Sequence, residues 1–229
     1  MTEKIDASGQ KTAYEYDLSG NLLKAINADG KSVSYAYDCN YQKISETDAN
    51  GNTTTYSYNG NMKPVLTTLP DGNTIQYEYD SEDRLIKTID QEGNETVTVY
   101  DKGGRITSTQ FADGSSVQYQ YDAVGNVVSE TNQVGGVTGR TYDAMGNVLT
   151  VTDALGNVTT NEYDCMSRLI RTVNPAGGVT VYEYSAAGKL LSETNPLGNM
   201  TAYTYDAYGN KARVTDSNGN GSIKGRFCD

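Results

Sequence analysis

Histidine and tryptophan are absent from the 229 residues of this chain, which holds only three cysteines, four prolines and two phenylalanines. Without histidine, the Ser–His and Cys–His pairs that activate a catalytic nucleophile cannot form. Metal-ligand spacings such as Cys-x-x-Cys are also lacking, so we interpret the cysteines as free thiols in loops. We therefore expect no enzyme: no catalytic residue, no cofactor site and no metal site is predicted.

Basic residues and long apolar runs are scarce as well. The chain has 18 lysines and arginines against 29 aspartates and glutamates, a net charge of −11. Such a chain cannot neutralise a row of phosphates, so nucleic acid is not an expected partner. No stretch approaches the roughly 20 apolar residues of a membrane-spanning helix. The segment from Met1 to Asp6 lacks the features of a secretion signal, so a signal for an exported protein would lie outside this chain.

Large aliphatic residues are few, and tyrosine and glycine are many. Leu, Ile, Val and Phe account for 40 of the 229 residues, whereas the chain has 19 tyrosines and 24 glycines. Tyrosine, valine, threonine and isoleucine favour strands, while glycine, asparagine and aspartate favour turns. The composition predicts many short strands joined by tight turns.

Two residue types recur with a period of 21 residues, without one insertion or deletion. The first series is Tyr16, Tyr37, Tyr58, Tyr79, Tyr100, Tyr121, Tyr142, Tyr163, Tyr184 and Tyr205. The second is Gly9, Gly30, Gly51, Gly72, Gly93, Gly114, Gly135, Gly156, Gly177, Gly198 and Gly219. Asp follows eight of the ten tyrosines, a second tyrosine often stands two residues before, and an aliphatic residue usually stands seven after. Each period thus holds two short alternating segments and two glycine-containing turns, which is typical of a β-hairpin.

The predicted fold is all-β: tandem 21-residue β-hairpin repeats that form one continuous antiparallel sheet. About ten repeats occupy residues 1–219, and residues 220–229 are a C-terminal tail or a truncated next repeat. Sheets of some twenty strands do not stay flat, because strand twist accumulates, so we expect the sheet to coil or spiral.

The strand register follows from the requirement that the apolar positions share one face. A three-residue loop, Ala28-Asp29-Gly30 with Gly30 left-handed, sets Leu23 opposite Tyr35 and Ala25 opposite Val33. For the other turn, a four-residue loop over residues 17–20 sets Tyr14 opposite Leu23.

The segments Tyr121-Asp-Ala-Val-Gly-Asn126 and Tyr142-Asp-Ala-Met-Gly-Asn147 closely resemble the RHS or YD repeat, and the resemblance covers roughly residues 6 to 219. It implies a non-catalytic, structural segment of a bacterial secreted or cell-surface protein. In this family the hairpins wind into a hollow shell or stalk, which encloses or displays a partner or a toxin domain. The expected partners are the rest of a larger protein of this family or other copies of the chain.

Two alternatives remain open at this point. Tyrosine-rich sheet faces can stack on sugar rings, so a carbohydrate-binding or adhesion module is the second function considered. Asp216-x-Asn218-x-Asn220-Gly221 matches the first half of a calcium-binding loop, but Phe227 stands where that loop needs a bidentate Glu. We interpret Asp216 as a residue of an ordinary repeat turn.

Overall fold

The structure, a computed structural model, describes residues 2–5 and 11–223. These residues form 22 β-strands joined by tight turns, and no helix occurs among them. The strands are β1 (Thr2–Ile5), β2 (Lys11–Tyr16), β3 (Leu22–Ile26), β4 (Ser32–Tyr37), β5 (Lys43–Thr47), β6 (Thr53–Tyr58), β7 (Pro64–Thr68), β8 (Thr74–Tyr79), β9 (Leu85–Ile89), β10 (Glu95–Tyr100), β11 (Ile106–Gln110), β12 (Ser116–Tyr121), β13 (Val127–Thr131), β14 (Val137–Tyr142), β15 (Val148–Thr152), β16 (Val158–Tyr163), β17 (Leu169–Val173), β18 (Val179–Tyr184), β19 (Leu190–Thr194), β20 (Met200–Tyr205), β21 (Lys211–Thr215) and β22 (Gly221–Ile223). The all-β prediction is confirmed.

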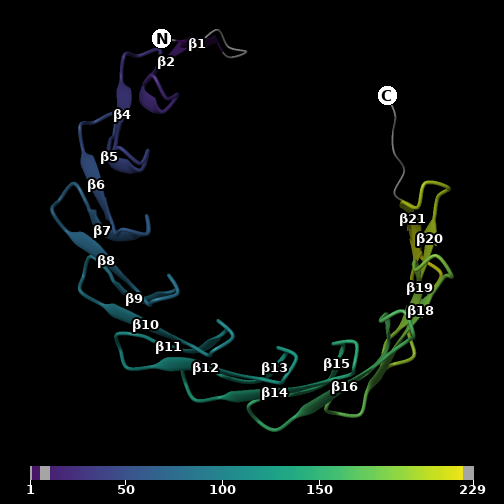
Figure 1. The fold of residues 1–229 in the computed structure, drawn as a ribbon. Coiled ribbons are helices and arrows are strands. Elements are labelled where there is room, and N and C mark those ends of the chain that lie inside the picture. Colours follow the sequence, from purple (N-terminus) through teal and green to yellow (C-terminus); the bar gives the residue numbers. More distant parts are fainter. Residues whose placement is uncertain (1, 6–10, 224–229) are drawn as a thin grey trace. The chain divides into compact units, whose positions relative to one another are not determined.

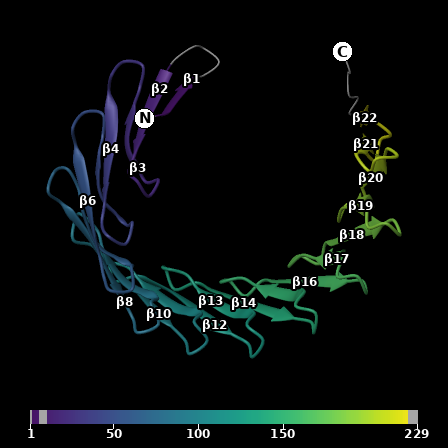
Figure 2. The same ribbon diagram turned by 45° about the horizontal axis from the view of Figure 1, so that its top comes forward.

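The chain divides into two compact units, unit 1 with residues 1–116 and unit 2 with residues 117–229. In unit 1, each strand from β1 to β11 pairs antiparallel with the next one along the chain. In unit 2, β12 to β22 pair in the same way. Figures 1 and 2 show this up-and-down course within each unit, with turns projecting from both ends of the strands. The predicted hairpin repeat is confirmed. The division at residue 219 into array and tail stays a prediction.

The turns fall into two sets, one on each rim of the sheet. The tyrosine-rim turns follow the periodic tyrosines and span 17–21, 38–42, 59–63, 80–84, 101–105, 122–126, 143–147, 164–168, 185–189 and 206–210. The glycine-rim turns contain the periodic glycines and span 27–31, 48–52, 69–73, 90–94, 111–115, 132–136, 153–157, 174–178, 195–199 and 216–220.

Both sets have the same geometry. In a glycine-rim turn, the Asn27 amide donates to the Lys31 carbonyl at 2.9 Å and the Gly30 amide to the Asn27 carbonyl at 3.0 Å. Gly30 has a φ of 77°, so it supplies the left-handed residue of a three-residue loop. Asp17 and Gly20 make the equivalent bonds on the tyrosine rim. The predicted three-residue loop with a left-handed glycine is therefore confirmed for the glycine rim. The predicted four-residue loop on the tyrosine rim is wrong, because that loop also has three residues.

A β-bulge in each hairpin accounts for the difference between the predicted and the observed strand register. Ala25 pairs with Val33 as predicted, but Tyr14 pairs with Ala25 and not with Leu23. The register shifts between Glu15 and Tyr16, and Leu23 has no partner on β2. The pairs between β3 and β4 end at Lys24 and Ser34, so the predicted pairing of Leu23 with Tyr35 is not among them. The aliphatic position seven residues after each periodic tyrosine is thus the bulged residue of its repeat, where we expected a regular strand position.

The bulge is what keeps all repeats facing the same way. With two three-residue loops and no bulge, each residue would align across a hairpin with the residue 20 positions later. Its equivalent, 21 positions later, would then lie on the opposite face, because side chains alternate along a strand. With the bulge, each residue aligns with the residue 19 positions later, as Tyr14 does with Val33 through Ala25. The equivalent residue, 21 positions later, is two residues further along the same strand and therefore points to the same face. Tyr14 and Tyr35 therefore share one face, which we call the tyrosine face.

Seven of the periodic tyrosines close the gap that the neighbouring bulge leaves. The ladder pairs between β3 and β4 end at Lys24 and Ser34, and beyond them the Tyr37 hydroxyl donates to the Leu22 carbonyl at 3.0 Å. Leu22 immediately precedes the bulged Leu23. The same bond, spanning 15 residues, joins Tyr58 to Lys43, Tyr100 to Leu85, Tyr142 to Val127, Tyr163 to Val148, Tyr184 to Leu169 and Tyr205 to Leu190. These hydroxyls replace ladder bonds near the tyrosine rim.

Neither unit has a conventional core. Among the described residues no large apolar side chain is buried, and the two residues with the lowest exposure are Thr67 at 9% and Ser192 at 6%. The strands form a single layer whose side chains are half-exposed on both faces. Stability in such an array comes from contacts between neighbouring repeats.

Left-handed turn positions provide a matched pair of stability predictions. Gly156, with a φ of 83°, has nothing within 4 Å of an added Cβ, so Gly156→Val should destabilise by about 1–3 kcal/mol through backbone strain alone. Met62 occupies the equivalent position on the tyrosine rim with a φ of 62°, so Met62→Gly should stabilise by about 0.5–1 kcal/mol. Urea unfolding of both variants measures the two effects. Equal effects of the same sign would contradict the shared turn geometry.

Candidate functional site

The carboxylates that recur along the tyrosine rim are fixed inside their own turns. One oxygen of Asp143 accepts the Met145 amide at 2.8 Å and the Asn147 amide at 2.9 Å. Its other oxygen accepts the Asn147 side-chain amide at 2.8 Å. Asp48 has the same three bonds on the glycine rim, with Asn50 and Asn52 as donors. These bonds account for the Asp-x-x-Gly-Asn signature by turn formation.

The bonds also set the acidity of these groups. The Asn147 side chain and then the Asn147 backbone amide lower the pKa of Asp143 below its usual value, because both donate to the charged carboxylate. Asn52 lowers the pKa of Asp48 in the same manner. A carboxylate that is held ionised by its own turn is a poor proton donor near neutral pH, and this favours a structural role.

Asparagine replaces aspartate in several turns and keeps the main interaction. The Asn132 side-chain oxygen accepts the Val134 amide at 3.1 Å and the Gly136 amide at 2.8 Å. Two glycine-rim turns begin instead with an apolar residue, Leu69 or Phe111. There an aspartate two residues later takes over: Asp71 accepts the Asn73 amide at 3.0 Å, and Asp113 accepts the Ser115 amide at 2.9 Å.

Basic side chains at the end of some tyrosine-rim turns link consecutive repeats. Arg84 donates to the Asp80 carboxylate at 2.7 Å and to the Asp101 carbonyl of the next turn at 3.2 Å. Its guanidinium lies 4.8 Å from the centre of the Tyr100 ring. Arg168 repeats the arrangement with Asp164, Ser185 and Tyr184. The guanidinium groups of Arg84 and Arg168 are thus bonded within the sheet, each to its own turn and to the next turn on the same rim.

The tyrosine face presents rings that are partly covered by cations. The Lys43 ammonium lies 5.7 Å from the Tyr35 ring and 4.9 Å from the Tyr56 ring, and the Lys211 ammonium lies 4.2 Å from the Tyr203 ring. Cation–π contacts of this kind stabilise exposed rings by about 0.5–1 kcal/mol each. The covered rings are less accessible to a stacking ligand.

The calcium-like segment forms an ordinary glycine-rim turn. One Asp216 oxygen accepts the Asn218 amide at 3.0 Å and the Asn220 amide at 2.8 Å. Phe227 lies outside the described residues. Across the part of the chain that the structure describes, no group of three or more His, Cys, Asp or Glu side chains is placed to hold a metal ion.

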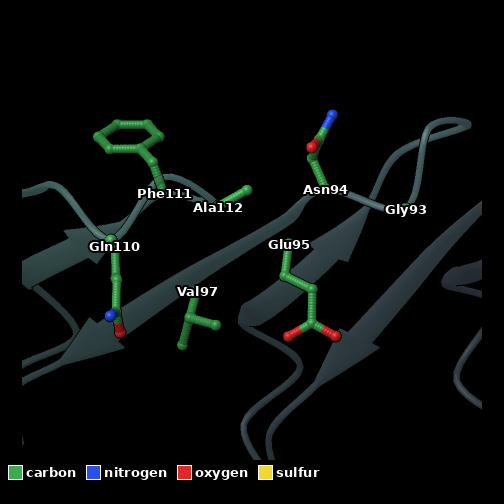
Figure 3. A pocket seen from close by; sticks show the side chains of 8 residues that line it. Gly93, Asn94, Glu95, Val97, Gln110, Phe111 and Ala112 are labelled. Atoms are coloured by element: carbon green, nitrogen blue, oxygen red, sulfur yellow. The ribbon is translucent and has the colours of Figure 1, made fainter.

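A hollow of about 420 Å³ lies beside β10 and β11, at the glycine rim of unit 1. Its lining residues are Gly93, Asn94, Glu95, Val97, Gln110, Phe111, Ala112 and Gly114. Figure 3 shows that Glu95, Val97 and Gln110 point to one side of the strands, whereas Asn94 and Phe111 point to the other. In a ligand site, polar side chains converge on one position. The side chains around this hollow do not.

Cys39 and Cys165 are exposed free thiols in tyrosine-rim turns, as predicted. In residues 2–5 and 11–223, no helix is long and apolar enough to cross a membrane.

The sequence matches the family model described as the RHS repeat. The matched segments are residues 1–32, 63–95, 100–138, 121–158, 142–179, 167–199 and 184–220. The chain belongs to the RHS repeat family. No curated protein matches the RHS-repeat chain in sequence.

Solved structures of similar fold come from Tc toxin complexes. The RHS-repeat chain is 18% identical to a chain of TcdB2-TccC3 without its hypervariable C-terminal region, with a TM-score of 0.68. It is likewise 18% identical to a chain of the Photorhabdus luminescens Tc holotoxin pore, with a TM-score of 0.57. The alignments cover 93% and 95% of this chain but only 13% and 14% of those chains. At this identity the likeness shows the fold, and the chain spans about an eighth of the length of those proteins.

Proposed function

We propose that this chain is a wall segment of an extracellular RHS-repeat shell or stalk, which encloses or displays a partner or a toxin domain and performs no chemistry itself. The single layer supports the proposal most directly. A sheet with no buried apolar side chain among its described residues acts as a wall between two spaces better than as a closed domain.

The polar groups support the same role. Carboxylates such as Asp143 are occupied by turn amides, Arg84 and Arg168 are occupied by neighbouring repeats, and the Tyr142 hydroxyl is occupied by a backbone carbonyl. These groups are held by the fold and are not free to bind or transform a substrate. The likeness to Tc toxin chains supports the shell, while export and enclosure are part of the proposal.

The two exposed thiols provide a test of export. Intact cells that make the complete natural protein are treated with a membrane-impermeant maleimide, and the peptides with Cys39 and Cys165 are assayed by mass spectrometry. We expect both peptides to be labelled without lysis, while a cytoplasmic control protein stays unlabelled. Labelling that appears only after lysis would contradict the extracellular location.

Enclosure is tested by protease protection of whatever domain copurifies with the complete protein. We expect that domain to resist digestion until urea unfolds the wall. If that domain is digested as fast in the complex as it is alone, the chain does not enclose it. Display of the domain on a stalk is then the alternative that remains.

Carbohydrate binding is the second candidate, supported by tyrosine rings that no cation covers. Tyr16 is 46% exposed and lies beside Tyr14, with ring centres 6.4 Å apart. Tyr41 is 62% exposed in the next tyrosine-rim turn. Calorimetry against a glycan panel decides this: saturable binding that is lost in Tyr16→Ala, but kept in Tyr16→Phe, would favour the carbohydrate module.

A further inference from the structure

The tip residue of each turn, the third of its five residues, differs systematically between the two units. All twenty tips are exposed. In unit 1 none is apolar: Ser19, Asp29, Asn40, Asn50, Asn61, Asp71, Glu82, Glu92, Gly103 and Asp113. In unit 2 the first nine are apolar: Val124, Val134, Met145, Leu155, Met166, Ala176, Ala187, Leu197 and Tyr208, followed by Asn218.

The turns themselves do not require apolar tips. The turns with Asp29 and Leu155 at the tip have the same two backbone hydrogen bonds and the same left-handed glycine, with φ of 77° for Gly30 and 83° for Gly156. Nevertheless the exposed fraction is 90% for Val134, 88% for Leu155 and 84% for Leu197. Apolar groups repeated at such exposure mark an interaction surface more often than a folding requirement.

We propose that unit 2 associates rim to rim with unit 2 of a second copy of this chain, through its apolar turn tips. This goes beyond the wall function proposed above and does not depend on export or enclosure.

The spacing of the tips supports a second copy as the occupant. Each rim presents one tip per hairpin, so successive tips are about 9.6 Å apart, twice the distance between neighbouring strands. A partner that fits many tips at once must carry apolar groups with this same period, and another copy has it by construction. Beside Val134 lies an open hollow of about 340 Å³, lined by Val117, Asn132, Gln133 and Val134, into which a tip of the other copy can insert.

Charge restricts the contact to unit 2. The chain carries a net charge of −11, so two copies repel each other at long range. In unit 1 the tips Asp29, Asp71, Glu92 and Asp113 would bring carboxylates together without a cation between them. In unit 2 the nine apolar tips add no charge at the contact, and burial of the larger ones favours association.

The test is the molecular mass of the chain in solution between about 1 and 200 µM, measured by sedimentation velocity. We expect the mass to rise above the monomer value of 24.8 kDa with concentration. The rise should be larger at about 0.5 M salt, because salt screens the repulsion between the acidic copies while the apolar contact persists.

The decisive variant combines Val134→Asp, Leu155→Asp and Leu197→Asp. Asp29, Asp71 and Asp113 occupy the same turn position in unit 1, so these substitutions suit the fold, and circular dichroism verifies it. Each removes one apolar contact, so we expect the dissociation constant to rise by about 100-fold or more.

The matched control combines Ser19→Asp, Asn40→Asp and Asn50→Asp, which adds the same charge at the same turn position of unit 1. It should associate within about three-fold of the original chain at 0.5 M salt. The proposal is overturned if the original chain stays monomeric throughout, or if the control loses association as strongly as the unit 2 variant. Binding of the monomeric chain to phosphatidylcholine vesicles through the same tips would assign them to a lipid surface and also overturn it.

Discussion

As the pH falls below about 4, this chain should lose stability, because turn after turn loses its ionised aspartate. Eleven aspartates in the described residues have a lowered pKa: Asp17, Asp48, Asp80, Asp90, Asp101, Asp113, Asp122, Asp143, Asp153, Asp164 and Asp206. For a group whose folded pKa is lowered, the stabilisation is present above its unfolded pKa of about 3.9 and is lost as the pH falls through the folded value. The unfolded chain therefore binds more protons in this range.

The overall negative charge acts in the opposite direction. Protonation reduces the repulsion within a chain of net charge −11, which favours the folded state. That repulsion is spread over an exposed sheet and screened by salt, whereas the turn bonds are contacts of 2.8–2.9 Å at residues such as Asp48. The loss of the turn bonds should therefore dominate.

Urea midpoints measured from pH 7 to pH 2 test this expectation. The control variant carries Asp48→Asn, Asp143→Asn and Asp153→Asn, because Asn132 shows that asparagine can hold the turn without a titrating group. The control should be less stable than the original chain at pH 7 and should lose less stability on acidification. A midpoint that is constant or rises between pH 4 and pH 2 would show that the turn carboxylates do not control folding.

Removal of the hydroxyls that join neighbouring strands should destabilise unit 2 by on the order of 3 kcal/mol in total. The variant combines Tyr142→Phe, Tyr184→Phe and Tyr205→Phe, and each substitution deletes one bond to a backbone carbonyl, worth about 1 kcal/mol. The phenylalanine rings preserve the stacking under Arg168 and Lys189, so the measured loss belongs to the hydroxyls. Urea unfolding gives the total, and amide exchange should locate the weakening near the tyrosine rim of unit 2.

Tyr79 provides the matched control. It stands in the same position of its repeat, but its hydroxyl makes no hydrogen bond to the Pro64 carbonyl 15 residues earlier, where the bonded tyrosines have their acceptor. Tyr79→Phe should therefore change the free energy of unfolding by less than about 0.5 kcal/mol. A loss equal to that of Tyr184→Phe measured alone would assign the effect to the ring environment instead of the bond.

Much of the fold could be predicted from the sequence, because period, alternation and turn residues agree with one another. The strands and the left-handed glycines such as Gly30 follow from local preferences, and the structure confirms them. The bulge at Leu23 was missed because an aliphatic residue in an alternating segment is indistinguishable from a regular strand position. A signal was available: Asp17-x-x-Gly20 and Asn27-x-x-Gly30 both encode a three-residue loop, and an odd period with two such loops requires an extra residue.

The role of the tyrosine hydroxyls was less accessible. Their acceptor is a backbone carbonyl, which any residue supplies, so Leu22, Lys43 and Val127 serve equally and leave no sequence signature. The change from polar to apolar tip residues between the two units can be seen in the sequence. Its interpretation as an interaction surface depends on the exposure of the tips and on the shared turn geometry. Neither is available before the register is known.

The bulge also gives the sheet a built-in shear. Because residues align across a hairpin at 19 positions while the repeat is 21, each repeat steps two residues along the strand direction relative to the previous one. Two residues correspond to about 6.8 Å and one hairpin to about 9.6 Å of width, so a line through equivalent tyrosines runs about 35° from the perpendicular to the strands. Strands in closed barrels tilt by roughly 35–45°. One extra residue per repeat thus makes the strands of each unit oblique to the direction in which its repeats advance, by an angle within the range found in closed barrels.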